Sequence, residues 1–138
     1  VLADPEGNEF CVLDTRPEYA STGALAAIVV DALEPLRLAE FWAAASGWPI
    51  VETTEATASL RPPMARGPWL EFIPTKHPHE AKNRVHLDVA PFLEDDHWAE
   101  TTRLLELGAR KVDIGQGSVP WVVLADPEGN EFCVLPPR

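Results

Sequence analysis

Alternating ionisable residues in the second half of the chain form its most distinctive chemical pattern. In the run RVHLDV, Arg84, His86 and Asp88 alternate with valine and leucine. Successive side chains of a β-strand point to opposite faces of the sheet, so these three groups would share one face. Ionisable groups on an inward face are costly unless they are paired, solvated or bound to an ion. The run therefore predicts a strand that contributes to a functional site.

Two glutamates also alternate with apolar residues in other predicted strands. Glu131 precedes Phe132 and lies on the opposite face from it, while Glu71 lies between Leu70 and Phe72. The apolar residues of each strand must meet a helix layer, which directs the carboxylates toward the other face. We expect that face to be the concave one.

The elements that would position these residues follow one order in both halves of the chain. The first half predicts a strand at 24–31, a helix from Glu34-Pro35 to Gly47, and strands at 49–55, 58–61 and 68–74. The second half predicts a strand at 84–90, a helix at 95–107, and strands at 111–114, 119–125 and 131–135. The predicted buried stripes of the two helices are Leu38, Phe41, Trp42 and Ala45, and Trp98, Thr101, Leu104 and Leu105.

This order predicts an α+β fold of two βαβββ modules, at about 22–75 and 83–135. Their strands would form a curved, cup-like mixed sheet with the helices outside. The linker between the modules contains His77-Pro78-His79. Histidines at i and i+2 in a loop are usually solvated, so we interpret this pair as a surface feature.

Three motifs together resemble a known family. The helix segment LAEFW (38–42), the linker and strand KNRVHLD (82–88) and the hairpin DPEGNEFCVL (126–135) are similar to the glyoxalase-like branch of the vicinal oxygen chelate superfamily. That superfamily includes glyoxalase I, extradiol dioxygenases and bleomycin-resistance proteins. The resemblance covers residues 22–135 and implies paired βαβββ modules around a cup.

The resemblance also implies a set of metal ligands on the first and last strands of each module. Carried over to this sequence, it implies His86, Glu131 and Glu71 as ligands, whereas the fourth position falls on Val29, which cannot bind a metal. One imidazole and two carboxylates suit Zn, Mn, Ni, Co or ferrous Fe. Such a metal would act as a Lewis acid, and Glu131 or Glu71 could serve as the catalytic base.

Other side chains are candidates for contacting the substrate. Arg84 and Asp88 share the predicted face of His86, and Trp69 shares that of Glu71. Trp121 lies on the strand before the final hairpin. Aromatic walls suit a flat or apolar ligand, although plain sheet packing explains both tryptophans equally well.

The two ends of the chain carry the same peptide. Residues 1–13 and 123–135 both read VLADPEGNEFCVL. We interpret residues 1–13 as the closing hairpin of a similar upstream domain, and its unpaired strand could pair with its own sheet or with a neighbouring chain. A homodimer or a tandem-domain association is therefore expected. The cysteines of the two copies, Cys11 and Cys133, are interpreted as small apolar strand residues.

Composition restricts the classes of partner. The 138 residues include 11 basic and 22 acidic ones, so the formal net charge is −11. This balance argues against binding to nucleic acid or to an anionic membrane surface. No apolar run approaches the roughly 20 residues of a membrane helix, and two cysteines are too few for a disulfide framework. We therefore expect a cytoplasmic protein that binds a small molecule.

Three functions remain in competition. The first is a glyoxalase-like lyase or isomerase with a divalent metal in the cup. The alternative is a metal-free small-molecule binding protein of the bleomycin-resistance type, which the valine at position 29 favours and for which the acidic charge weakly suggests a cationic ligand. In the third, residues 1–13 mediate assembly and the cup has no activity.

Overall fold

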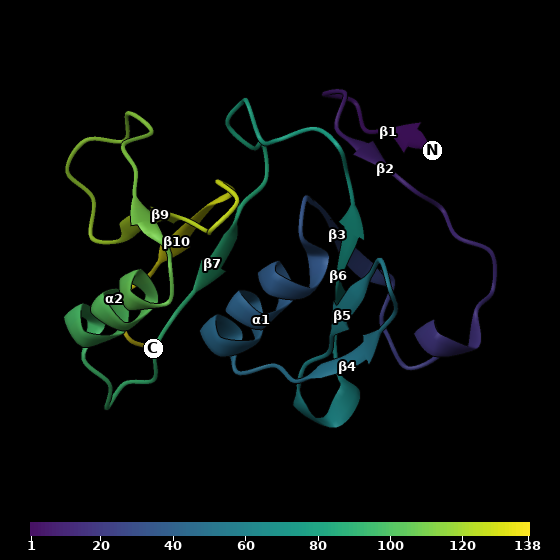
Figure 1. Ribbon diagram of the computed structural model, residues 1–138, viewed down its shortest axis with the longest axis horizontal. Helices are drawn as coiled ribbons and strands as arrows, with labels where there is room; N and C mark the ends of the chain where they lie inside the picture. Colours follow the sequence, from purple (N-terminus) through teal and green to yellow (C-terminus); the bar gives the residue numbers. More distant parts are fainter.

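Two βαβββ modules make up most of the computed structural model, which describes residues 1–138 (Figure 1). The first module contains β3 (Ala27–Ala32), α1 (Pro35–Ser46), β4 (Ile50–Thr53), β5 (Ala58–Leu60) and β6 (Trp69–Pro74). The second contains β7 (Leu87–Val89), α2 (His97–Glu106), β8 (Arg110–Lys111), β9 (Val122–Ala125) and β10 (Glu131–Val134). The predicted α+β class and the order of elements are confirmed.

Each module forms its own four-stranded mixed sheet. The strand orders are β3-β6-β5-β4 and β7-β10-β9-β8, and in both sheets the first strand of the module lies parallel to the last. Val29 pairs with Glu71 in the first module, and Asp88 pairs with Cys133 in the second. Side chains from the first and last strands of a module therefore stand next to each other on one face.

Helix α1 begins and ends where the sequence predicts. Pro35 occupies its first turn, where the missing N–H costs nothing, and Gly47 follows it in the left-handed conformation with a φ of 72°. The predicted stripe is buried; it comprises Leu38, Phe41, Trp42 and Ala45.

One hydrophobic core connects the two modules through α1. The Phe132 ring of β10 lies 5.9 Å from that of Phe41 and 5.2 Å from that of Trp42, centroid to centroid, in edge-to-face arrangements. The same cluster of buried residues includes Phe72 of the first sheet and Leu104 of α2. Because α1 packs against both sheets, the modules are held as one unit.

The prediction for Trp98 is wrong. Its side chain is 65% exposed and lies under the Lys111 ammonium group, whose nitrogen is 4.7 Å from a ring centroid. Thr101 and Leu104 are buried as predicted. His97 lies four residues before Thr101, and its Nε2 is 3.0 Å from the carbonyl oxygen of Val134. The inward position of this first turn therefore belongs to His97.

The strand around His86 is shorter than predicted. It begins only at Leu87, so both Arg84 and His86 lie outside it. The Arg84 guanidinium instead donates to the carbonyl oxygen of Glu6 at 3.1 Å. This contact links the chain just before β7 to the N-terminal repeat.

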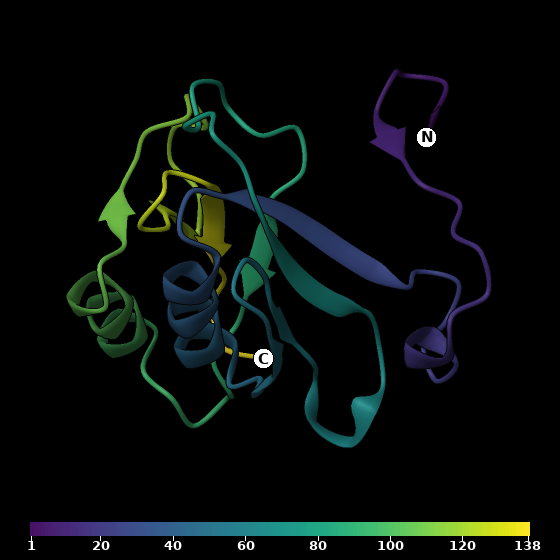
Figure 2. The same ribbon diagram turned by 45° about the vertical axis from the view of Figure 1, so that its right-hand side comes forward.

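The N-terminal repeat forms a separate hairpin of β1 (Leu2–Ala3) and β2 (Glu9–Phe10), whose strands pair with neither of the two four-stranded sheets (Figure 2). Its turn repeats three hydrogen bonds of the C-terminal copy. Asp4 accepts them from Glu6 and Asn8, as Asp126 does from Glu128 and Asn130 in the C-terminal turn. The surroundings differ, since Phe10 is 46% exposed and Phe132 is fully buried. A short 3₁₀ helix at Pro17–Tyr19 follows and leads to β3.

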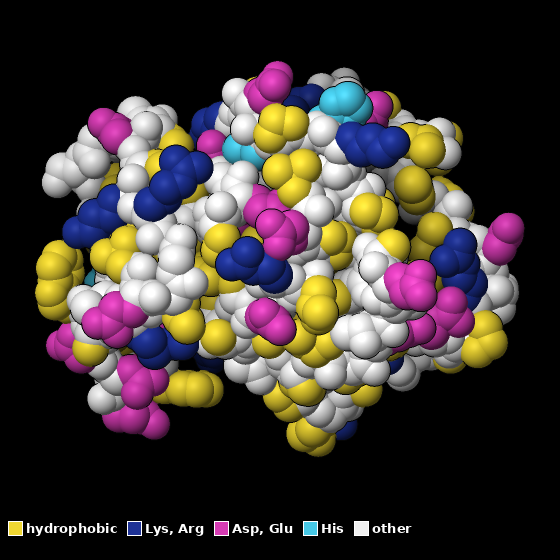
Figure 3. Space-filling view, in the orientation of Figure 1, with side chains coloured by type: hydrophobic (Ala, Val, Ile, Leu, Met, Phe, Trp, Pro, Cys, Tyr) yellow, Lys and Arg dark blue, Asp and Glu magenta, His cyan; other side chains and the backbone are white.

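The surface carries both signs of charge. On the face drawn in Figure 3, Lys and Arg side chains occur among acidic and apolar ones. None of the helices is long and apolar enough to pass through a membrane.

Replacing Asp126 by alanine tests the link between the modules. This fully buried carboxylate accepts hydrogen bonds from Trp42 Nε1 and from the backbone of Glu128 and Asn130. Its loss leaves buried donors without a partner, so we expect the free energy of unfolding to fall by about 3 kcal/mol or more, measured by urea denaturation.

Asp4→Ala is the matched control, because it removes the same turn hydrogen bonds from an identical peptide on the surface. We expect it to lower the free energy of unfolding far less than Asp126→Ala does, because an exposed donor that loses its partner can bind water. Equal losses for the two variants would contradict the account.

Candidate functional site

A cavity of about 510 Å³ lies between β3 of the first module and the start of β7 and β10 of the second. Its lining contains five carboxylates and three of the four histidines, and it includes neither lysine nor arginine. The ionisable lining residues are Asp31, His77, His79, Glu80, His86, Asp126, Glu128 and Glu131.

Glu131 is held at this cavity by the linker between the modules. Its Oε2 accepts a hydrogen bond of 3.0 Å from the backbone N–H of Asn83 and lies 3.5 Å from His79 Nε2. Burial by itself would raise the pKa of the carboxyl. Hydrogen bonds from the backbone of Asn83 and of Glu131 itself, together with the His79 imidazole, outweigh burial and lower the pKa of Glu131 below its usual range. Glu131 is therefore an ionised group at the cavity wall at neutral pH.

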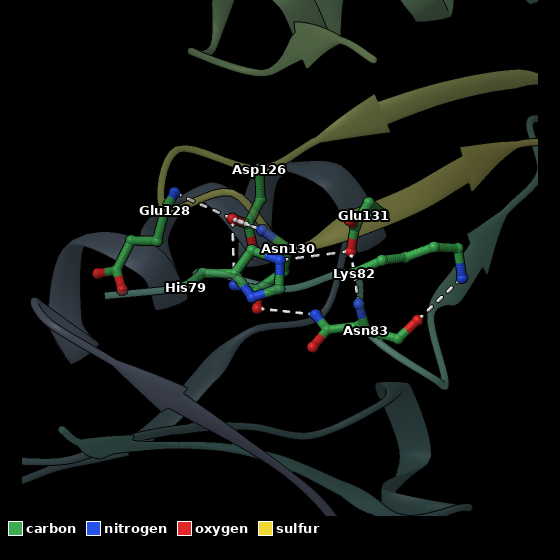
Figure 4. A network of polar contacts seen from close by, with 7 residues as sticks. All are labelled: His79, Lys82, Asn83, Asp126, Glu128, Asn130 and Glu131. Atoms are coloured by element: carbon green, nitrogen blue, oxygen red, sulfur yellow. Dashed lines mark hydrogen bonds and ion pairs between the residues drawn. The ribbon is translucent and has the colours of Figure 1, made fainter. Parts of the chain in front are cut away.

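The turn before β10 fixes the start of that strand. Asp126 Oδ1 accepts from the backbone N–H groups of Glu128 and Asn130, both at 3.0 Å, and its Oδ2 accepts from Trp42 Nε1 at 3.1 Å. Asn130 in turn accepts from the Asn83 side chain at 3.0 Å. Figure 4 shows this network, which extends from the turn through Asn130 to the linker and Glu131. The polar side of the cavity is thus built from the turn and the linker together.

The role of His79 is not apparent from its sequence pattern. His77-Pro78-His79 predicts a solvated pair, whereas the structure places His79 against Glu131 and both histidines at the cavity. The imidazole of His79 is only 20% exposed. The available signal was that the linker connects two modules that face one cup, because a connection of that kind must cross the rim of the cup.

His86 lies close to two further side chains of the same sheet face. Its Nδ1 is 3.5 Å from Cys133 Sγ, and Asp88 pairs with Cys133 across the two parallel strands. Ligand atoms of His86, Asp88 and Cys133 all lie within 4.8 Å of one another. Burial, followed by the neighbouring Asp88 carboxylate, raises the pKa of the Cys133 thiol to about 11. The thiol is therefore protonated at neutral pH.

Glu71 is separated from His86 and Glu131. Its Oε1 accepts a hydrogen bond of 2.8 Å from the Tyr19 hydroxyl, and it lines a different cavity that is bounded by residues 9–27. Burial, followed by the hydrogen bond to Glu71, raises the pKa of Tyr19. Val29, opposite Glu71 in the sheet, is 53% exposed and reaches both cavities. The structure thus brings together two of the three expected metal ligands, and Glu71 is not among them.

The four expected substrate contacts also lie away from the cavity between the modules. Trp69 is buried under the Arg61 guanidinium and donates to the carbonyl oxygen of Glu18 at 3.2 Å. Trp121 donates to Gln116 in a separate loop region. Arg84 contacts Glu6, and Asp88 faces Cys133. Of the residues singled out in the sequence for a site, only His86 and Glu131 line this cavity.

The chemistry available to the cavity is that of carboxylates and imidazoles. Carboxylates attract and hydrogen-bond cationic groups, and imidazoles donate, accept or exchange protons near neutral pH. No lysine or arginine of the lining competes with a bound cation. The site is therefore suited to a positively charged ligand.

Comparison with known proteins agrees with the architecture. A sequence model of the glyoxalase-like domain matches residues 27–135. A search of curated protein sequences finds no match.

Solved structures share the fold at low sequence identity. A glyoxalase/bleomycin resistance protein/dioxygenase family enzyme from Burkholderia phytofirmans PsJN is 12% identical, with a TM-score of 0.65 over 83% of this chain and 98% of that one. A glyoxalase/bleomycin resistance protein from Albidiferax ferrireducens T118 is 17% identical, with a TM-score of 0.59 over 84% and 100% of the chains. The fosfomycin resistance protein FosX from Mesorhizobium loti is 10% identical, with a TM-score of 0.60 over 81% and 90%.

The two cysteines are expected to differ in reactivity although their local sequences are identical. Cys11 is exposed, whereas Cys133 is buried and its thiol has a pKa of about 11. The thiolate is the reactive form, so iodoacetamide should alkylate Cys11 at mildly alkaline pH and leave Cys133 unmodified until the protein is unfolded. Peptide mass spectrometry measures the extent of alkylation of each cysteine. Equal labelling of the two in the folded protein would contradict the placement of Cys133.

Proposed function

Because the chain belongs to the glyoxalase-like domain family, we propose that it binds a small cationic organic molecule in the cavity between β3 and β10. The observation that carries this proposal is the charge of the lining, which combines five carboxylates with no lysine or arginine. A volume of about 510 Å³ lies within the range of small-molecule sites.

The distribution of hydrogen bonds indicates which carboxylates would meet the ligand. Asp126 is fully buried and bound to Trp42, and Glu128 accepts from the backbone of Leu33 and Glu34 at 2.7 and 2.8 Å. These two hold the fold together. Asp31 and Glu80 are exposed at the rim and Glu131 is half-buried, so they are the candidates for attracting a cation.

The residues present do not fit the metal site that the family resemblance implies. Glu71 is bound to Tyr19 and lines another cavity, and Val29 supplies no donor atom. Three ligands must converge on one ion for a catalytic metal centre, and the arrangement of this set does not provide that. We therefore derive no metal-dependent step from it.

A lyase or isomerase is the second candidate. It is favoured by one observation, that His86 and Glu131 line the same cavity and could act as an acid–base pair. The similar solved structures named above include a family enzyme and two resistance proteins, so both classes occur with this fold. Turnover of a bound compound would favour the enzyme, and its return unchanged would favour the binding protein.

A thermal-shift screen of matched aromatic amines, guanidines, neutral amides and carboxylates tests the proposal. We expect only cationic members to raise the melting temperature, since ligands that bind the folded state stabilise it, and we expect the shift to persist with excess chelator. Stabilisation by anionic compounds alone would contradict a cation site.

Glu131→Gln tests the role of the cavity wall in that binding. Removing its charge should weaken the best cationic binder about tenfold in calorimetry, or about 1.4 kcal/mol. Glu9→Gln is the control, because Glu9 occupies the same position in the N-terminal copy of the peptide. Equal affinities for the Glu131→Gln and wild-type proteins would exclude a role for Glu131 in binding the cation.

A further inference from the structure

We propose that His86, Asp88 and Cys133 form a binding site for a thiophilic divalent metal, with Zn²⁺ as the best match. The site shares His86 with the set implied by the family resemblance but uses neither Glu71 nor Glu131. It is independent of the cation-binding function proposed above.

The register of the second sheet brings the three side chains together. Asp88 of β7 and Cys133 of β10 are direct neighbours on parallel strands, and His86 precedes Asp88 by two residues. His86 comes directly before β7, and its Nδ1 lies 3.5 Å from Cys133 Sγ, so the three side chains meet on one face of the sheet. Their ligand atoms lie within 4.8 Å of one another.

The observed separation of sulfur and nitrogen is the one that a zinc ion requires. Zn–S and Zn–N bonds of about 2.3 and 2.05 Å at a tetrahedral angle place the two ligand atoms about 3.5 Å apart. Cys133 Sγ and His86 Nδ1 are 3.5 Å apart. Binding would displace the proton of the Cys133 thiol to solvent, and the pair can then hold one ion without movement of the strands.

The third ligand and the open position come from the exposed side of the cluster. Cys133 is buried, His86 is half-buried and Asp88 is exposed, so a carboxylate oxygen can approach from solvent. Three protein ligands leave a fourth position for water or for a small ligand.

The donor set selects the class of metal. Mg²⁺ and Ca²⁺ prefer oxygen ligands only, whereas a thiolate with an imidazole and a carboxylate suits Zn²⁺ or Co²⁺. A purely structural role for Cys133, as a small apolar strand residue, makes the opposite prediction that no such ion binds.

The repeat at the N-terminus supplies an internal control. Cys11 has the same thirteen-residue sequence around it as Cys133, but it is exposed and β2 pairs only with β1. The proposal therefore requires that only the second copy binds metal.

Titration of the full chain with Co²⁺, followed by Zn²⁺ competition, tests the site. We expect a thiolate-to-cobalt charge-transfer band at one equivalent, which Zn²⁺ removes. Cys133→Ser should abolish the band, and Asp88→Asn, an exposed substitution that leaves the core intact, should weaken affinity at least about tenfold. Cys11→Ser should behave as wild type.

Several outcomes would overturn the proposal. They are the lack of a band in the wild type, a band that is lost with Cys11→Ser, and an affinity that Glu131→Gln and Glu71→Gln reduce while Asp88→Asn does not. If Cys133→Ser fails to fold, the other two variants test the site in its place. A weaker affinity of Asp88→Asn together with one metal ion bound by Cys11→Ser supports the site, and any other combination contradicts it. Failure of the cation screen has no bearing on these results.

Discussion

The buried carboxylate of Asp126 is the contact on which the arrangement of the two modules depends. It fixes the turn before β10 through the backbone of Glu128 and Asn130, and it binds the indole of Trp42 on α1. Glu128 adds two hydrogen bonds to the chain that enters α1. Because the turn is attached to the helix of the other module, β10 starts at a defined place. The orientations of Glu131 and Cys133 follow from that start.

The two copies of the peptide separate what the sequence encodes locally from what tertiary contacts add. Both copies form the same turn, in which Asp4 and Asp126 accept from the backbone two and four residues ahead. Only the second copy lies within a larger sheet, where its two strands stand between β7 and β8 and Phe132 enters the core. The turn is thus a property of the peptide, whereas the burial of Cys133 and the position of Glu131 are properties of the fold.

The modules and α1 were predictable because their signals are local: strand alternation, a proline at the first turn and a glycine after the last. Trp98 was misplaced because either it or His97 could have filled the inward position of the first turn of α2, and the contact with Val134 that favours His97 is tertiary. Glu71 was expected beside His86 from the alternation of strand residues and from the ligand positions that the family resemblance implies. Its hydrogen bond to Tyr19, a residue 52 positions earlier, could not be inferred from periodicity. The same holds for His79, whose contact with Glu131 depends on the path of the linker.

In the proposed function, the ligand binds to the polar wall built from the linker and the turn, and not to the face of the first sheet that carries Glu71. Mapping amide chemical-shift changes during titration with a cationic binder tests this most directly. The account predicts changes concentrated in residues 77–87 and 126–131, which line the cavity between the modules. Changes concentrated around Tyr19, Trp69 and Glu71, with none at Glu131, would contradict it.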